Sequence, residues 1–191
     1  MRSKVDIYNG ALQRIGVRPL VGTSDERDEA VACGRSYEAA VEMVLSANNF
    51  QCSIRRARLA RLAEAPVFGF TYQYELPADF LHLVELNRPD ERGDGGGYSI
   101  ESGNRMLYSG EICEIIYVRR IDNPAEFSPE VARCVVLALA SLIIPQFSEN
   151  PDAGINILNE LEQVALPRAR TADNMQASMF RGRRFWTENL S

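Results

Sequence analysis

The spacing of apolar residues divides the chain into a helical first part, a β-like middle part and a helical last part. Apolar residues recur at helical spacing over residues 5–15 and 30–48. From Pro66 the period changes to two, as in "FTYQYEL" and "FLHLVELN", which predicts antiparallel strands. After Asp122 the helical period returns. This order predicts an α+β fold, a small helical bundle of about four helices with an inserted antiparallel β element and an extended C-terminal tail.

Capping residues mark three of the predicted helix starts. They are Ser3 with Asp6, Ser128 with Pro129, and Asn150 with Pro151. The helix that begins after Ser128 is apolar on nearly every side, so we expect it to lie at the centre of the bundle. Its apolar run, "VVLALASLII", is shorter than the ~20 residues that a membrane-spanning helix needs, which favours a core helix. Pro167 is expected to kink the last helix.

The pattern predicts four consecutive parts. Residues 1–65 form the first half of the helical bundle, residues 66–122 the β insertion and residues 123–174 the second half of the bundle. Residues 175–191 form the C-terminal tail, because apolar periodicity fades there. We expect this tail to be disordered alone and to dock on a partner; the alternative is that it folds back onto its own bundle. Its candidate anchors are Phe180, Arg181, Arg183, Arg184, Phe185 and Trp186.

The chain is acidic overall, with a formal net charge of -5 at pH 7, so any phosphate-binding surface has to be local. A local candidate is the arginine-rich stretch "SIRRARLARL", residues 53–62. Three interpretations stay open: pairing with acidic groups of the same or a neighbouring subunit, a solvated face, and contact with DNA. The first is preferred, with the acidic helix start "DERDE" as partner. It pairs Arg55, Arg56, Arg58 and Arg61 with Asp25, Glu26, Asp28 and Glu29.

A polar, glycine-rich segment, "RPDERGDGGG" over residues 88–97, predicts a loop at the tip of the β element. It does not match a phosphate-binding loop, because no G-K-[ST] follows and the next residues have the pattern of a strand. We expect this loop to face the tail or a neighbouring subunit. Its charged residues are Arg88, Asp90, Glu91, Arg92 and Asp94.

Residues that could carry catalysis or hold a metal are few. The four cysteines are far apart, with no C-x-x-C pair, and His82 is the single histidine, so a zinc site is not expected. The motifs G-x-S-x-G and H-E-x-x-H and the nucleotide-binding fingerprints do not occur. We therefore expect no enzyme activity, no cofactor and no metal. The N-terminus lacks the apolar run of a signal peptide, so we expect a cytoplasmic, reducing origin.

Four stretches carry a family resemblance when they are taken in order. They are "DIYNGALQRIG" (residues 6–16), "NNF" with the arginines after it, "PVFGFTYQYELPADFL" (66–81) and "YVRRIDNPAEFSPE" (117–130). Together they resemble the tail tubular protein A family, the head-to-tail adaptors or gatekeepers of short-tailed bacteriophages, over about residues 4–165. Relatives commonly carry a tryptophan two places before the phenylalanine of the second stretch. Here Asn48 precedes Phe50, so a local packing contact of the family is in doubt.

The resemblance implies a structural virion protein. Its expected assembly is a ring of about twelve copies, a homododecamer, at the head-tail junction. The expected partners are further copies of the chain, the portal protein and the tail nozzle or tail tube protein, with no membrane involved. Double-stranded DNA would pass through the ring without specific binding, and an acidic protein suits such a channel. The implied location is the virion, and the host cytoplasm during assembly.

Two alternatives come from other functional classes. One is a small DNA-binding or DNA-packaging accessory protein that uses the arginines of residues 55–61, for which a salt-dependent affinity for duplex DNA would speak. The other is a hydrolase, which would lose activity on substitution of His82 or of a carboxylate pair.

Overall fold

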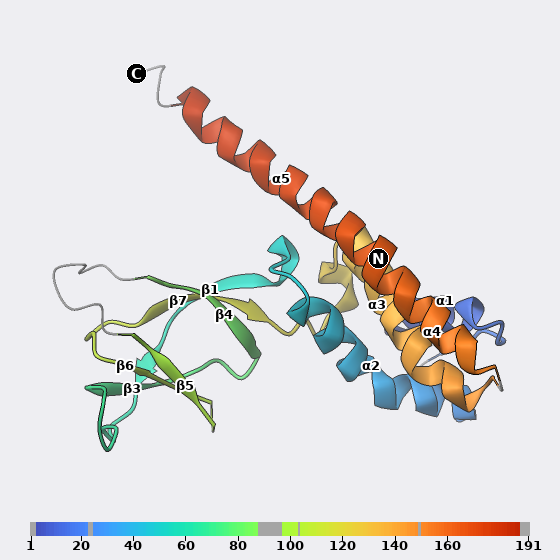
Figure 1. Ribbon diagram of the computed structural model, residues 1–191, viewed down its shortest axis with the longest axis horizontal. Helices are drawn as coiled ribbons and strands as arrows, with labels where there is room; N and C mark the ends of the chain where they lie inside the picture. The colour runs from blue at the N-terminus through green and yellow to red at the C-terminus, as the bar shows by residue number, and fades with distance from the viewer. Residues whose placement is uncertain (1–2, 23–24, 88–96, 103, 149, 188–191) are drawn as a thin grey trace. The chain divides into compact units, whose positions relative to one another are not determined.

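A computed structural model describes residues 3–22, 25–87, 97–102, 104–148 and 150–187 of the chain (Figure 1). The chain divides into two compact units. The helical unit comprises Met1–Cys52 and Ile121–Ser191, and the β unit comprises Ser53–Arg120. The β unit is therefore an insertion between the second and third helices, and the helical unit is assembled from two separate chain segments.

The helical unit is built from capped helices whose starts agree with the sequence signals. Ser3 and Asp6 form a reciprocal capping box, and the Ser128 hydroxyl and the Asn150 side chain each accept a backbone N–H of the helix that follows. The helices are α1 (Lys4–Arg14), α2 (Asp28–Ser46), α3 (Pro129–Ile143), α4 (Pro151–Glu160) and α5 (Leu166–Thr187), with 3-10 turns at Gln51–Ser53, Pro124–Glu126 and Ile144–Gln146.

Helix α3 lies at the centre of this unit, as the sequence predicts, and packs against α1, α2, α4 and α5. The segment Pro129–Gln146 is long and apolar enough to cross a membrane, but 56% of it is buried inside the protein, which identifies a core helix. Gly10 lets α1 approach α3 closely, because a Cβ at that position would lie 3.1 Å from a methyl group of Val136 in α3.

Between α4 and α5 the helix widens for one turn. Leu161–Ala165 form a π-helical segment, η4, and the Leu166 N–H donates to the Leu161 carbonyl five residues back. The wide turn ends just before Pro167, whose ring would clash with the carbonyl four residues earlier in a regular α-helix. The irregularity that the sequence predicts at Pro167 therefore takes the form of a π-bulge.

Two side chains fasten helix α5 to the segment that follows α2. The Arg170 guanidinium donates to the Ala47 carbonyl oxygen at 2.7 Å. The Asp173 carboxylate accepts the Gln51 N–H at 3.1 and 3.2 Å and is only 8% exposed. Burial raises the pKa of Asp173, while the Gln51 N–H acts in the opposite direction. These two contacts position the first half of α5, before the segment that was expected to be a tail.

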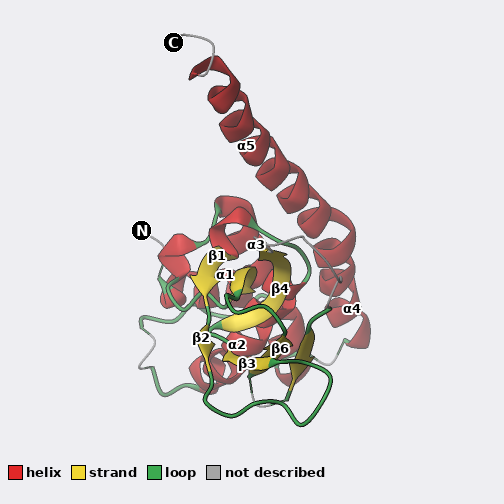
Figure 2. Cartoon of the chain, turned by 90° about the vertical axis from the view of Figure 1, so that its left-hand side faces the viewer, coloured by secondary structure: helices red, strands yellow, loops and turns green. Residues whose placement is uncertain are grey.

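The β unit contains two antiparallel sheets, whose strands are yellow in Figure 2. One has the order β1-β7-β4 and the other the order β2-β3-β6-β5. The strands are β1 (Ile54–Arg58), β2 (Ala60–Arg61), β3 (Tyr72–Glu75), β4 (Phe80–Asn87), β5 (Ser99–Glu101), β6 (Arg105–Tyr108) and β7 (Glu114–Arg119). Both sheets contribute to one core, which contains Leu59, Tyr74, Leu76, Met106, Cys113, Ile115 and Tyr117.

The predicted fold of a four-helix bundle with one β element and an extended tail is wrong. The structure is α+β with two antiparallel sheets, and residues 166–187 are helical rather than extended. The tail prediction failed because it depended on apolar periodicity, which a helix needs only where it packs on a core. Its composition of Leu, Ala, Met, Gln and Arg favours helix without such a stripe.

The first boundary between the parts also differs from the expected one. Residues 53–65 were expected in the helical part, whereas the β unit begins at Ser53. The stretch "SIRRARLARL" supplies strands β1 and β2, with β1 paired along its length with β7. The sequence did not predict this strand, because its arginines occupy positions on both faces of the sheet and obscure the period of two.

We expect Asp173 to stabilise the helical unit through its hydrogen bond and to destabilise it through its charge. Asp173→Ala should lower the free energy of unfolding by about 1 kcal/mol, because the Gln51 N–H loses its acceptor. Asp173→Asn keeps an acceptor and removes the buried charge. The folded state raises the pKa of Asp173 above its ordinary value of 3.8, so folding favours the protonated carboxyl group. The stability that this contributes is complete below pH 3.8 and is lost as the pH rises through the folded-state pKa.

The stability of Asp173→Asn relative to wild type should therefore improve from pH 4 to pH 7. Urea unfolding of the three proteins at both pH values measures this. Equal pH dependence of the wild type and Asp173→Asn would contradict the electrostatic part, and equal stability of the Ala and Asn variants would contradict the hydrogen-bond part.

Candidate interaction surface of the β unit

The arginines of residues 55–61 lie on two strands of the β unit, and three of them have partners within it. Arg55 pairs with Asp79 at 3.5 Å, and Arg58 pairs with Glu114 at 2.5 Å. The Arg61 guanidinium lies 3.7 Å from the centre of the Tyr72 ring. Three of the four cations are thus engaged inside their own unit, which leaves Arg56 as the member with no hydrogen bond or ion pair to any described residue.

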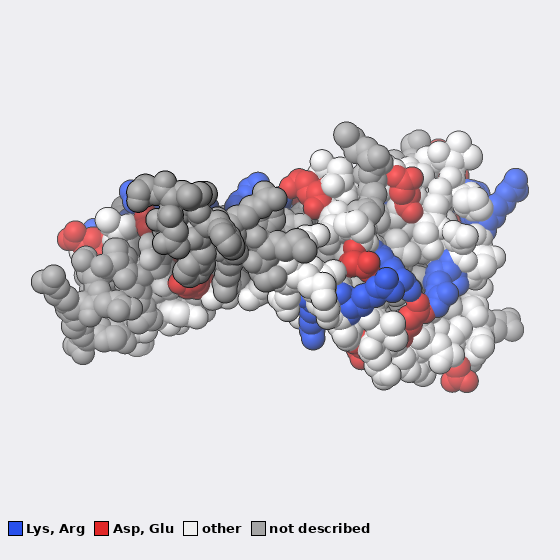
Figure 3. All heavy atoms as spheres, turned by 90° about the horizontal axis from the view of Figure 1, so that it is seen from above, with Lys and Arg blue, Asp and Glu red and all other residues white. Residues whose placement is uncertain are grey.

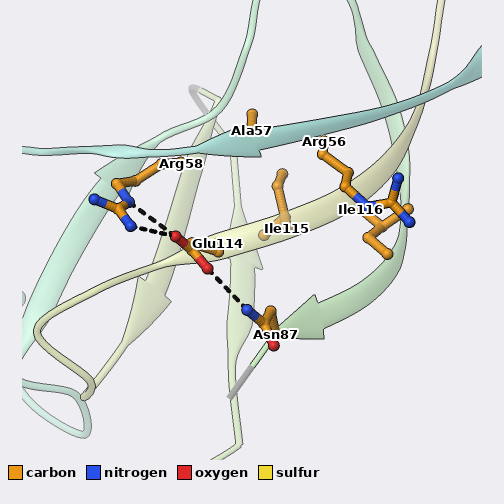
Figure 4. Close-up of a pocket in the computed structure, with 7 residues that line it drawn as sticks. All are labelled: Arg56, Ala57, Arg58, Asn87, Glu114, Ile115 and Ile116. Atoms are coloured by element: carbon orange, nitrogen blue, oxygen red, sulfur yellow. Dashed lines mark hydrogen bonds and ion pairs between the residues drawn. The ribbon is translucent and has the colours of Figure 1, made fainter. Parts of the chain in front are cut away.

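The register of β1, β7 and β4 places two rows of side chains on the outer face of their sheet. Arg58 lies opposite Glu114, which lies opposite Asn87, and two residues along the strands Arg56, Ile116 and Glu85 form a second row. Figure 4 shows the first row joined by hydrogen bonds, with Arg56 and Ile116 at the other end of the close-up. The opposite face carries Ala57 and Ile115 toward the core.

Residues of these rows other than Glu85, together with Ala57 and Ile115 between them on the strands, line a hollow of about 430 Å³ (Figure 4). We call it the outer hollow. It is lined by Arg56, Ala57, Arg58, Asn87, Glu114, Ile115 and Ile116.

Glu114 is held on both sides within this hollow. One of its oxygens accepts the Arg58 Nε at 2.9 Å, and the other accepts the Asn87 Nδ2 at 2.8 Å. These bonds, that of Arg58 first, lower the pKa of Glu114 below its ordinary value of 4.5. A carboxyl group that acts as a general acid or base near pH 7 works best with a raised pKa, and the pKa of Glu114 is shifted the other way. The arrangement therefore favours recognition over proton transfer.

The second row contrasts with the first because its charges are not paired. Arg56 and Glu85 are both exposed and flank Ile116 from the two outer strands. Neighbouring strands are about 4.8 Å apart, so the two charged residues lie roughly 10 Å from each other across the sheet. Neither makes an ion pair or hydrogen bond with the rest of the described chain. A half-buried apolar side chain between two available charges can receive an apolar or aromatic group.

A second feature of the β unit was not predicted from the sequence. In the loop at residues 62–71, between β2 and β3, Val67 is 97% exposed and Phe68 is 85% exposed. Gly69 follows with φ +85°, a conformation that favours glycine. We call Val67 and Phe68 the apolar tip. The signal in the sequence was "PVFGF", where apolar residues sit between a proline and a glycine and so belong to a loop.

The acidic helix start lies in the helical unit, at the beginning of α2. Asp25 accepts hydrogen bonds from Arg27, which lower the pKa of Asp25, and Arg27 also donates to the Pro19 carbonyl. Glu26 and Asp28 are exposed, and Glu29 is half-buried. Pairing of Asp25, Glu26, Asp28 and Glu29 with the arginines of another subunit stays a prediction.

The structure describes the other two predicted sites, the charged loop and the end of the C-terminal segment, only in part or not at all. The charged loop with Arg88, Asp90, Glu91, Arg92 and Asp94 lies outside the described residues. Residues 180–186 belong to α5 by their backbone, and their side chains are not described.

Three of the four cysteines have the environment of core residues, and Cys52 is half-buried. Cys33, Cys113 and Cys134 are buried, and burial raises the pKa of each thiol to about 11. These thiols are therefore neutral near pH 7, whereas nucleophilic attack and metal binding need the thiolate. In the part of the chain that the structure describes, no three His, Cys, Asp or Glu side chains are grouped as a metal site.

Charges of opposite sign lie near one another on the surface. On the face drawn in Figure 3, blue Lys and Arg atoms are interspersed with red Asp and Glu atoms among the described residues. Ion pairs of this kind in the helical unit include Arg14 with Glu160 and Arg168 with Glu130. Mixed charge of this kind offers less attraction for a polyanion than a basic stripe does.

The titration of Glu114 should report the two bonds that hold it. Carboxyl NMR of the wild type should give a pKa for Glu114 below 4.5. Arg58→Ala should raise that pKa more than Asn87→Ala does, because the charged donor lowers it most. A larger rise in Asn87→Ala, or no rise in either variant, would contradict the geometry of this row.

Comparison with known proteins does not assign the chain to a family. No protein-family model matches the chain, and no curated protein sequence matches it either.

Proposed function

We propose that this chain is a structural head-to-tail adaptor of a bacteriophage virion. In this proposal copies of the chain form a ring of about twelve subunits between the portal and the tail nozzle. The ring surrounds the channel through which double-stranded DNA leaves, and it acts by joining other proteins rather than by catalysing a reaction. The sequence resemblance over about residues 4–165 supports the proposal.

The observation that carries the proposal is the exposure of large apolar side chains on both units. The apolar tip of the β unit is the first place, with 97% and 85% exposure. On the helical unit, Ile155 of α4, Val164 of η4 and Met175 of α5 are 57%, 54% and 61% exposed. Adjacent exposed apolar side chains, such as those of Val67 and Phe68, are typical of surfaces that other proteins cover, and an aromatic side chain there can act as an anchor. An adaptor that joins two assemblies and its own copies needs several such surfaces.

The proposal assigns the surfaces to partners. The last turns of α5, with Phe180, Arg181, Arg183, Arg184, Phe185 and Trp186, dock on the portal. The charged loop at residues 88–97 faces the nozzle or a neighbouring subunit. Fastening α5 at Arg170 and Asp173 supports the first assignment, because a helix anchored at one end can present its other end to a partner.

The DNA-binding alternative has weaker support from the structure. Arg55, Arg58 and Arg61 already have partners, so few cations of the cluster are available for phosphates. Each phosphate contact contributes about one unit to the salt dependence of affinity, so a DNA-binding protein should show a steep slope. Filter binding to duplex DNA at two salt concentrations separates the alternatives: tight binding with a steep slope would favour the accessory protein.

Electron microscopy of portal complexes tests the adaptor proposal directly. When this protein is mixed with portal protein, class averages viewed down the channel axis should show a ring with cyclic symmetry. Averages of well-occupied portal particles that contain no ring of this protein would refute the proposal.

Truncation tests the docking assignment separately. Deleting residues 180–191 should leave the thermal midpoint of the isolated protein nearly unchanged, because the anchors Arg170 and Asp173 remain. It should abolish recruitment to portal-containing heads in a sedimentation assay. Leu12→Ala is the matched control, because Leu12 of α1 is fully buried, so its loss should lower the midpoint and spare recruitment. A truncated protein that melts many degrees lower and is still recruited would place the end of α5 in the protein's own core.

A further inference from the structure

The apolar tip and the outer hollow are separate features of the β unit, and among the described residues no side chain fills the hollow or covers the tip. Phe68 is 85% exposed and is not among the residues that line the hollow. The tip projects an aromatic ring beside Val67, which is 97% exposed, and the hollow offers Ile116 beside Arg56, whose guanidinium has no ion pair with a described residue. An exposed aromatic side chain and a hollow with an available arginine form a complementary pair.

We propose that the apolar tip of one copy inserts into the outer hollow of a second copy of this chain. Phe68 of the first copy packs on Ile116 of the second, with the Arg56 guanidinium over the aromatic ring. The hollow of about 430 Å³ has room for the side chains of both Val67 and Phe68. Arg56 suits this role because it makes no ion pair or hydrogen bond with the described residues that would have to be broken, whereas Arg58 is held by Glu114.

The contact joins two different surfaces, so it is heterologous and repeats. Each copy that uses its tip still offers its hollow, and each copy that uses its hollow still offers its tip. Repetition of such a contact closes into a ring when the rotation per copy allows it and otherwise extends as a filament. The inference deepens the proposed function, and it rests on that function only for closure into a ring.

The charges around the hollow favour a protein occupant over a polyanion. Glu114 and Glu85 lie in the two rows beside Arg58 and Arg56, so acidic groups balance the basic ones locally. A nucleic-acid phosphate would meet both signs of charge there and be repelled by the carboxylates, whereas an aromatic ring carries no net charge and can pack on Ile116 and the Arg56 guanidinium. The remaining rival is insertion of the apolar tip into a lipid surface, which would leave the hollow unused.

Complementation between two single variants tests the contact. Phe68→Glu removes the tip and keeps the hollow, whereas Arg56→Glu alters the hollow and keeps the tip. Sedimentation of the wild type should show association that increases with concentration, and each variant alone should associate at least tenfold more weakly. Mixing the two variants restores one tip-to-hollow contact, so the mixture should form one-to-one dimers and no longer chains. Val21→Glu is the matched control, because Val21 is also 97% exposed but lies in the helical unit.

Photo-crosslinking identifies the occupied surface. With p-benzoylphenylalanine in place of Phe68, peptides crosslinked between copies should contain residues 54–58 or 114–119. The inference is overturned if the mixture stays as monomeric as the separate variants, if Val21→Glu weakens association equally, or if the crosslinks fall elsewhere. Monomeric wild type that floats with phosphatidylcholine vesicles in a Phe68-dependent way would assign the tip to a membrane instead. Rings on portal particles without this crosslink would leave the proposed function standing and overturn only this contact.

Discussion

Burial of helix α3 is the constraint on which the helical unit depends. This helix is apolar on nearly every side, so it can be stable in water only when neighbours cover it all round. The helices α1 and α2 come from before the β unit, and α4 and α5 from after it, and all four pack on α3. Covering one helix thus ties together two chain segments that are separated by the whole β unit.

The β unit solves a similar problem with strands from its two ends. Strand β1 opens the unit and pairs with β7, which closes it, so the chain enters and leaves through neighbouring strands of one sheet. The second sheet shares the core beneath this pair through Tyr74 and Met106. One sheet face is thereby committed to the core, and the opposite face of β1, β7 and β4 carries the outer hollow. The candidate surface follows from the same pairing that closes the unit.

Most of the charged side chains discussed above bind groups that are close to them in the fold. Asp173 receives a backbone N–H, Arg58 holds Glu114, and Arg27 holds Asp25, each close to an element end or across one strand pair. Exposed ion pairs of this kind contribute little stability each, so their main effect is to fix side-chain directions. The groups that stand apart are Arg56 and Glu85 on either side of Ile116, together with the exposed Val67 and Phe68. These side chains are therefore the ones in the β unit that a second molecule can contact without breaking an ion pair between described residues.

The sequence by itself determined the capped helix starts at Ser3, Ser128 and Asn150, the central helix α3 and strand β4, because each depends on neighbours within a few residues. Only the tertiary structure decided that the arginine stretch is a strand, since its partner β7 lies about sixty residues later. The same holds for α5, whose anchors Ala47 and Gln51 come from the other chain segment. The outer hollow and the exposure of the tip depend on which faces are covered, and local periodicity does not contain that information.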